Sequence, residues 1–68
     1  MIRVVTGRDL MVGDRIVWCG KPHRITRLVD GEPEGRGRVV TRSIFLDGFA
    51  SDEPALAVFD HWEVETVA

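Results

Sequence analysis

The sequence predicts an all-β fold, a small barrel of five to six antiparallel strands formed by a single domain over residues 1–68. Short stretches rich in β-branched residues alternate with Gly, Pro and Asp turn signals at a spacing of roughly 8–12 residues. No stretch of about ten residues shows the periodicity of a helix. Together these observations favour a small barrel or sandwich over any helical fold.

The first predicted strand runs from Ile2 to Thr6, because this stretch is rich in β-branched residues. Alternation places Ile2 and Val4 on its inner face, and Gly7 ends the strand. In the connector that follows, we expect Leu10 to turn inward and plug the core.

Residues 10–29 form the most explicit part of the chain, a β-hairpin. A turn at Gly13-Asp14 is expected before a strand over 15–19, because Gly takes positive φ easily and Asp accepts bonds from nearby amides. Gly20-Lys21-Pro22 predicts the tight hairpin turn, since proline cannot donate to a ladder. The second strand of the hairpin is expected over 23–30.

That second strand changes face along its length. Ile25 shares its parity with Val29, whereas Leu28 falls on the opposite parity. A bulge or a strong bend explains such a change. Residues 31–37, GEPEGRG, contain no apolar residue and are expected to form a mobile loop.

A long strand is expected over 38–46, with Arg42 on the same parity as Val40 and Ile44. This polar residue on the inner face indicates a bend nearby. After a loop over 47–54, closing strands are expected over 55–59 and 62–67, separated by a turn or bulge at Asp60-His61. The expected core consists of Ile2, Val4, Leu10, Ile16, Trp18, Ile25, Leu28, Val40, Ile44, Leu46, Leu56, Val58, Trp62 and Val64.

The charge is distributed unevenly. All nine basic residues lie in residues 1–42 with five acidic residues, a net charge of +4, whereas residues 43–68 carry six acidic residues and no Lys or Arg, a net charge of −6. Such asymmetry can mark an interaction face. The alternative, which we favour, is that the two halves are neighbours in one sheet and pair their charges across strands.

Composition also bears on the compartment. No apolar run approaches the ~20 residues that a membrane span requires, and the N-terminal stretch has no signal-peptide pattern. Cys19 is the only cysteine, so the chain has no internal disulfide. We therefore expect a cytoplasmic protein with no membrane partner.

Catalysis and metal binding are not expected. Cys19 and His23 flank the same hairpin turn, but hairpin geometry alone accounts for that spacing. Asp60, His61 and Glu63, together with His23, offer nitrogen and oxygen ligands at a spacing that is not specific to a metal site. The sequence thus predicts a non-enzymatic protein without catalytic residues, metal or cofactor.

A nucleic-acid or ribosome-binding patch is one candidate function. Basic side chains near the hairpin tip and in the Gly-rich loop would contact phosphates, and exposed aromatic rings would stack on bases. The candidate partner-binding residues are Lys21, Arg24, Arg36, Arg38, Phe45 and Phe59. Against this function, Glu32 and Glu34 lie in the same loop and the pI is about 5.5.

Protein binding is the function that we favour from the sequence. The apolar residues Val39, Phe45, Phe49, Phe59 and Val67 exceed what so small a core needs, and a leftover apolar patch would serve a protein partner or a homodimer. An edge strand offers a second route, because it can accept a strand from a partner.

Residues 9–48 resemble the SH3-like, KOW-like barrels of translation and transcription proteins, and most of all the N-terminal domain of elongation factor P. The resemblance rests on Gly13-Asp14, Gly20-Lys21-Pro22 and Gly35-Arg36-Gly37. It implies an SH3-like barrel, with Arg36 as the counterpart of the modified basic residue that the factor presents to the ribosome. Glu32 and Glu34 depart from that pattern, so the resemblance supports the barrel rather than the translation role.

The closing stretch ALAVFDHWEVETV is similar to small barrel proteins of actinobacteria and their phages. This similarity implies a phage or phage-derived protein that engages a host factor. The prediction from sequence is therefore a protein-binding module, and the alternative is a KOW-like nucleic-acid or ribosome-binding module.

Overall fold

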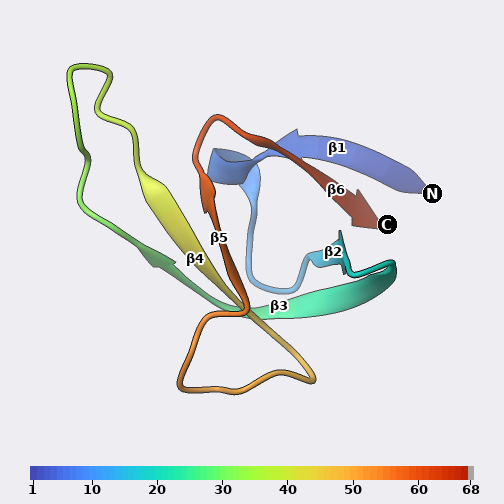
Figure 1. The fold of residues 1–68 in the computed structure, drawn as a ribbon. Helices are drawn as coiled ribbons and strands as arrows, with labels where there is room; N and C mark the ends of the chain where they lie inside the picture. The colour runs from blue at the N-terminus through green and yellow to red at the C-terminus, as the bar shows by residue number, and fades with distance from the viewer. Residues whose placement is uncertain (68) are drawn as a thin grey trace.

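The computed structural model describes residues 1–67 and arranges them as one twisted sheet of six antiparallel strands in the order β1-β6-β2-β3-β4-β5 (Figure 1). A short 3-10 turn, η1 (Gly7–Asp9), follows β1. The strands are β1 (Ile2–Thr6), β2 (Arg15–Trp18), β3 (Lys21–Asp30), β4 (Thr41–Leu46), β5 (Leu56–Phe59) and β6 (Glu63–Val67). The prediction of an all-β fold is confirmed.

The hydrogen-bond ladder is open, with β1 and β5 as its two edge strands. The long strand β3 joins the two halves, because its first residues pair with β2 and its last residues pair with β4. The sheet bends along β3, and η1 comes to lie beside the end of β5 (Figure 1). Backbone bonds from Gly7 N to Trp62 O (2.8 Å) and from Arg8 N to Asp60 O (2.9 Å) connect these segments.

The connector before the hairpin forms as the sequence predicts. Leu10 is only 2% exposed and is part of the core. Gly13 has a φ of +99°, and Asp14 Oδ2 accepts a hydrogen bond of 3.0 Å from Met11 N. Residues 8–14 thereby close one end of the bent sheet.

The tight hairpin turn lies one residue earlier than the sequence predicts. Trp18 pairs with Lys21 and Val17 pairs with Pro22, so the two-residue loop is Cys19-Gly20. Both loop residues have positive φ, +53° and +78°, which is the pattern of a type I′ turn. The proline is accommodated as the second residue of β3, so the prediction of Gly20-Lys21-Pro22 as the turn was wrong.

Replacing Cys19 by asparagine should stabilise this hairpin. Cysteine adopts the left-handed region here at an energetic cost, and asparagine tolerates the same conformation better. We therefore expect the substitution to raise the free energy of unfolding by roughly 0.5–1 kcal/mol. Urea denaturation monitored by tryptophan fluorescence measures the change. Gly20→Ala, at the neighbouring positive φ, is the opposite control and should destabilise; an unchanged or lower midpoint for Cys19→Asn would contradict the type I′ assignment.

The predicted bulge in β3 is confirmed. The register with β4 shifts between Ile25 and Arg27. The Arg27 guanidinium lies over the ring of Phe45, 4.3 Å from its centroid, and Phe45 is 6% exposed. The end of β4 is therefore buried on both faces, with Ile44 and Leu46 facing the main core.

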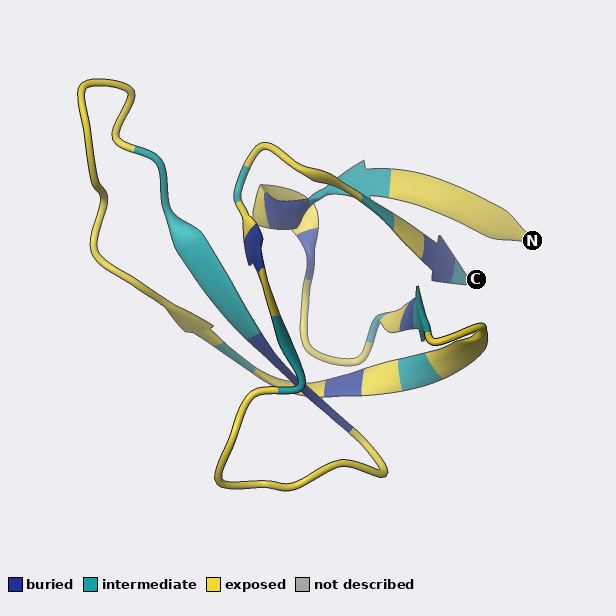
Figure 2. Ribbon diagram, viewed as in Figure 1, coloured by how far each residue is buried: buried dark blue, intermediate teal, exposed yellow. Residues whose placement is uncertain are grey.

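Most of the predicted core is confirmed, with errors in β1 and in the turn before β6 (Figure 2). Ile2, Val4 and Trp62 are 61%, 54% and 47% exposed, so their assignment to the core was wrong. Val5 packs against the core instead, because β1 turns its odd-numbered residues inward. The core cluster consists of Leu10, Ile16, Ile25, Ile44, Leu46 and Val58.

The fourth strand is shorter than the sequence predicts. It begins at Thr41, and residues 38–40 belong to the long arm between β3 and β4 (Figure 1). A single bridge between Glu34 and Val39 closes the tip of this arm, and Arg38 has a φ of +50°. Because the backbone turns there, the ladder of β3 and β4 ends before it reaches the arm.

The contacts of Arg42 explain why this polar residue lies on the inner face of β4. Its side chain is 14% exposed, and its Nε donates to Asp30 Oδ1 at 2.7 Å. Its Nη1 donates to the carbonyl oxygens of Gly7 (2.8 Å), Arg8 (3.2 Å) and Leu10 (2.9 Å). Through these hydrogen bonds the guanidinium holds η1 against the sheet.

Candidate functional site

A hollow of about 340 Å³ lies between β5 and the strands β2 and β6, and most of its lining is apolar. Its floor includes the buried residues Ile16 and Val58. The complete lining is Ile16, Val17, Trp18, Leu56, Ala57, Val58, Trp62, Glu63, Val64 and Glu65. We call this feature the tryptophan hollow.

The pairing of the strands creates the tryptophan hollow. In residues 1–67, β2 and β6 pair at Arg15 with Val67 and at Ile16 with Thr66, and no pairing of the two strands is found beyond Ile16. The turn that follows Phe59 connects β5 to β6. The side chains of Trp18 and Val64 fill part of the resulting space and pack against the core.

An exposed aromatic cluster continues the hollow onto the surface. The ring of Phe59 meets the ring of Trp62 edge to face at 4.8 Å and stacks on His61 at 5.8 Å. Phe59 is 38% exposed and Trp62 is 47% exposed. Trp62 belongs both to this cluster and to the lining of the hollow, so an apolar surface runs from one to the other.

Two acidic residues of β6 belong to the lining of the hollow, and because Val64 between them packs against the core, their side chains lie on the opposite face of the strand. These residues, Glu63 and Glu65, are both exposed. Within residues 1–67, neither carboxylate takes part in an ion pair; the Arg–Asp pairs are Arg8 with Asp60 and Arg42 with Asp30, and His61 Nδ1 lies 3.4 Å from Asp60 Oδ1. Arg8 and Asp60, 3.7 Å apart, join the basic half to the acidic half, but this pair connects η1 to the turn after β5 and does not run across two strands, so the predicted pairing of the two halves across strands is not found in residues 1–67.

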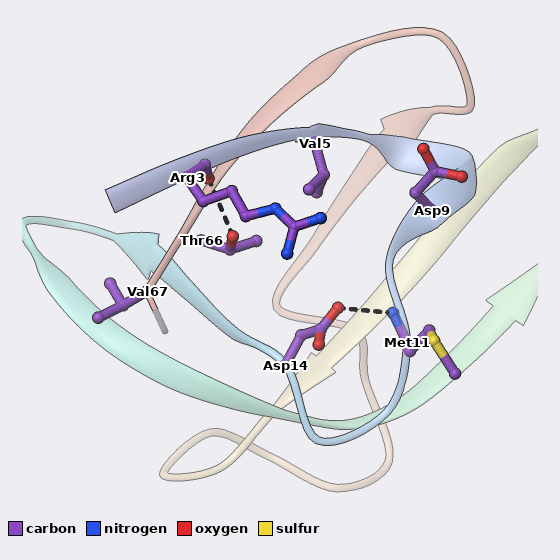
Figure 3. A pocket seen from close by; sticks show the side chains of 7 residues that line it. All are labelled: Arg3, Val5, Asp9, Met11, Asp14, Thr66 and Val67. Carbon is purple, nitrogen blue, oxygen red and sulfur yellow. Dashed lines mark hydrogen bonds between the residues drawn. The ribbon is translucent and has the colours of Figure 1, made fainter. Parts of the chain in front are cut away.

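A second hollow, of about 310 Å³, lies between β1, β6 and the connector before the hairpin (Figure 3). The guanidinium of Arg3 reaches into it, with Asp9 and Asp14 on the opposite side (Figure 3). Asp9 already accepts a bond from Thr6 Oγ1, and Asp14 accepts one from Met11 N. One arginine faces two aspartates there, and both aspartates already accept hydrogen bonds from the chain, so we do not assign a ligand to this hollow.

The four predicted basic residues lie at the two ends of β3. Lys21 and Arg24 are in its first half, whereas Arg36 and Arg38 are on the arm beyond its last residue (Figure 1). Ten residues of strand span roughly 33 Å. The structure therefore does not bring these four side chains together into one patch.

The two predicted aromatic residues also have different surroundings. Phe45 is buried under Arg27, so its assignment as an exposed ring for base stacking was wrong. Phe59 is exposed and belongs to the aromatic cluster beside the tryptophan hollow.

Cys19 and His23 are placed apart by the hairpin. The thiol lies on the exposed turn, and the ring of His23 packs edge to face against Phe49 at 5.0 Å. No hydrogen bond joins the two side chains in the part of the chain that is described. In that same part, no group of three or more His, Cys, Asp or Glu side chains has the arrangement of a metal site.

The sequence pointed to Phe59 but not to Trp18 or Trp62 as residues of the site. Trp62 lies between the Asp60-His61 turn and β6, and its position directly after turn residues was the one signal for its exposure. No family model matches the chain, and no curated protein or solved structure shows significant similarity to it. In residues 1–67, no helix has the length and apolar character needed to cross a membrane.

Proposed function

We propose that this chain is a non-enzymatic protein-binding module that holds a segment of its partner in the tryptophan hollow. One observation carries the proposal: the lining of the hollow is mostly apolar and continues into the exposed ring of Trp62. Large aromatic side chains at the centre of an apolar depression are the residues that dominate the energy of protein interfaces.

The charge of the site favours a protein over a nucleic acid as the partner. The aromatic cluster lies beside Glu63 and Glu65, and carboxylates repel a phosphate backbone. The basic residues that would contact phosphates lie at the two ends of β3. A ribosome-binding role resting on Arg36 would use the arm, which is separate from the hollow.

Panning the folded protein against a library of random twelve-residue peptides tests the proposal. We expect the enriched peptides to lose at least about thirtyfold in affinity for Trp62→Ala, because a central aromatic residue contributes about 2 kcal/mol or more to binding. Phe49→Ala is the matched control, since Phe49 is an exposed ring (42%) that does not line the hollow. Fluorescence anisotropy measures both affinities.

Two results would contradict the proposal. Enriched peptides that bind Trp62→Ala and Phe49→Ala equally well would place the binding surface elsewhere. Binding to single-stranded or duplex nucleic acid that weakens steeply with salt, and that is lost with Arg36→Glu, would instead support the nucleic-acid-binding function.

A further inference from the structure

The tryptophan hollow has an acidic side. Glu63 and Glu65 are exposed, and neither belongs to an ion pair within residues 1–67. The strands beside β6 carry Arg3 and Arg15, opposite Thr66 and Val67, and in residues 1–67 neither forms an ion pair with these glutamates. Since Val64 faces the core, a segment that sends one set of side chains into the hollow presents its other set on the face of Glu63 and Glu65, where carboxylates favour basic side chains and disfavour acidic ones.

The hollow also offers backbone groups. Asp60 N donates to Val40 O at 2.8 Å, and two residues earlier Val58 pairs with Arg42. Since hydrogen-bonded pairs alternate along an antiparallel ladder, the amide and carbonyl of Ala57 point away from β4 towards the open edge of β5. Ala57 is exposed and lines the hollow, so its backbone is available to a partner.

We infer that the hollow takes an extended basic segment of a protein partner, which lies along the edge of β5. In an extended strand, alternate side chains point in opposite directions. One set enters the apolar lining between Trp18 and Trp62, and lysine or arginine residues of the other set lie close to Glu63 and Glu65. The inference rests on the proposed function and specifies the charge and conformation of the partner.

The test uses two fluorescein-labelled decapeptides in which lysine or glutamate alternates with valine around one central tryptophan. We expect the lysine peptide to bind at least about tenfold more tightly than the glutamate peptide at low salt, because two ion pairs form in place of two repulsions. Glu63→Lys/Glu65→Lys should reverse this preference. Asp52→Lys/Glu53→Lys changes the net charge equally outside the hollow and should preserve it.

A third probe isolates the backbone contribution without altering the protein. N-methylation of every second amide of the lysine peptide keeps all its side chains but removes the N–H donors along one edge of the extended peptide. The two possible sets of alternate amides give two methylated peptides. We expect the one that loses the donors facing β5 to bind at least about tenfold more weakly. Equal affinity for all methylated and unmethylated peptides would overturn the extended, edge-paired geometry.

Three further outcomes would overturn the inference, and they separate its failure from that of the proposed function. Library peptides that require Trp62 but are neutral or acidic would keep the proposed function and remove the basic partner. Failure of the lysine peptide to bind at low salt would also remove the basic partner, while the library experiment decides separately on the proposed function. A dimer in sedimentation velocity that dissociates with Trp62→Ala would show that a second copy occupies the hollow.

Discussion

Replacing Arg42 by methionine should lower the free energy of unfolding by about 3 kcal/mol, because hydrogen bonds to a charged group contribute about 1.5–3 kcal/mol each and several are lost together. The backbone oxygens of Gly7 and Leu10 would lose their donor. A domain of this length has a total stability of roughly 3–10 kcal/mol, so the variant should melt at least about 12 °C lower. Circular dichroism during heating measures the shift.

Two control variants separate the effect of the hydrogen bonds to η1 from the effect of the ion pair with Asp30. Asp30→Asn removes the ion pair alone; because Asp30 is 56% exposed, the loss should stay below about 1 kcal/mol. Arg42→Lys keeps the charge but lacks the fork of donors, so its stability should fall between those of wild type and Arg42→Met. If Asp30→Asn costs as much as Arg42→Met, the carbonyl bonds contribute little.

Replacing Gly7 by alanine should destabilise the fold by about 2–3 kcal/mol, the usual cost of forcing an atom into a filled space. A Cβ at this position would lie 2.5 Å from Phe59 O and 3.2 Å from Val58 Cγ2. The contact is with backbone, so β5 or η1 must move, and the bond from Gly7 N to Trp62 O would be strained. Urea unfolding followed by tryptophan fluorescence measures the loss.

Gly37→Ala is the matched control for Gly7→Ala. A Cβ there meets only Val39 Cγ2 at 3.8 Å, an ordinary contact, and its φ lies outside the left-handed region. We expect a change of no more than about 0.5 kcal/mol in either direction. Equal destabilisation by the two substitutions would show that the effect at Gly7 does not come from the close approach of β5.

Local chemistry was sufficient to predict most of the strands. The parity change between Ile25 and Leu28 correctly indicated the bulge, and Gly13-Asp14 correctly indicated the turn before β2. These features depend on neighbours in the sequence, which is why alternation and turn residues report them. The hairpin turn was missed by one residue because Pro22 tolerates a strand position when its nitrogen need not donate.

The site depends on contacts between distant segments, and no local pattern reports these. The inward face of β1 is set by its pairing with β6, so parity alone assigned Val4 instead of Val5 to the core. Phe45 is buried because the bulge brings Arg27 over its ring. The tryptophan hollow arises where β2 and β6 stop pairing, a property of the bent sheet that neither strand carries alone.

The pairing of β1 with β6 has a consequence for how the protein is made. Ile2 pairs with Val67, and in residues 1–67 β1 has no ladder partner other than β6. β1 is synthesised before β6 and therefore waits for it, and contacts of such long sequence separation slow folding. During that interval an apolar strand bearing Ile2 and Val4 is open to pairing with other chains, so the nascent protein is most prone to aggregate before residues 63–67 emerge.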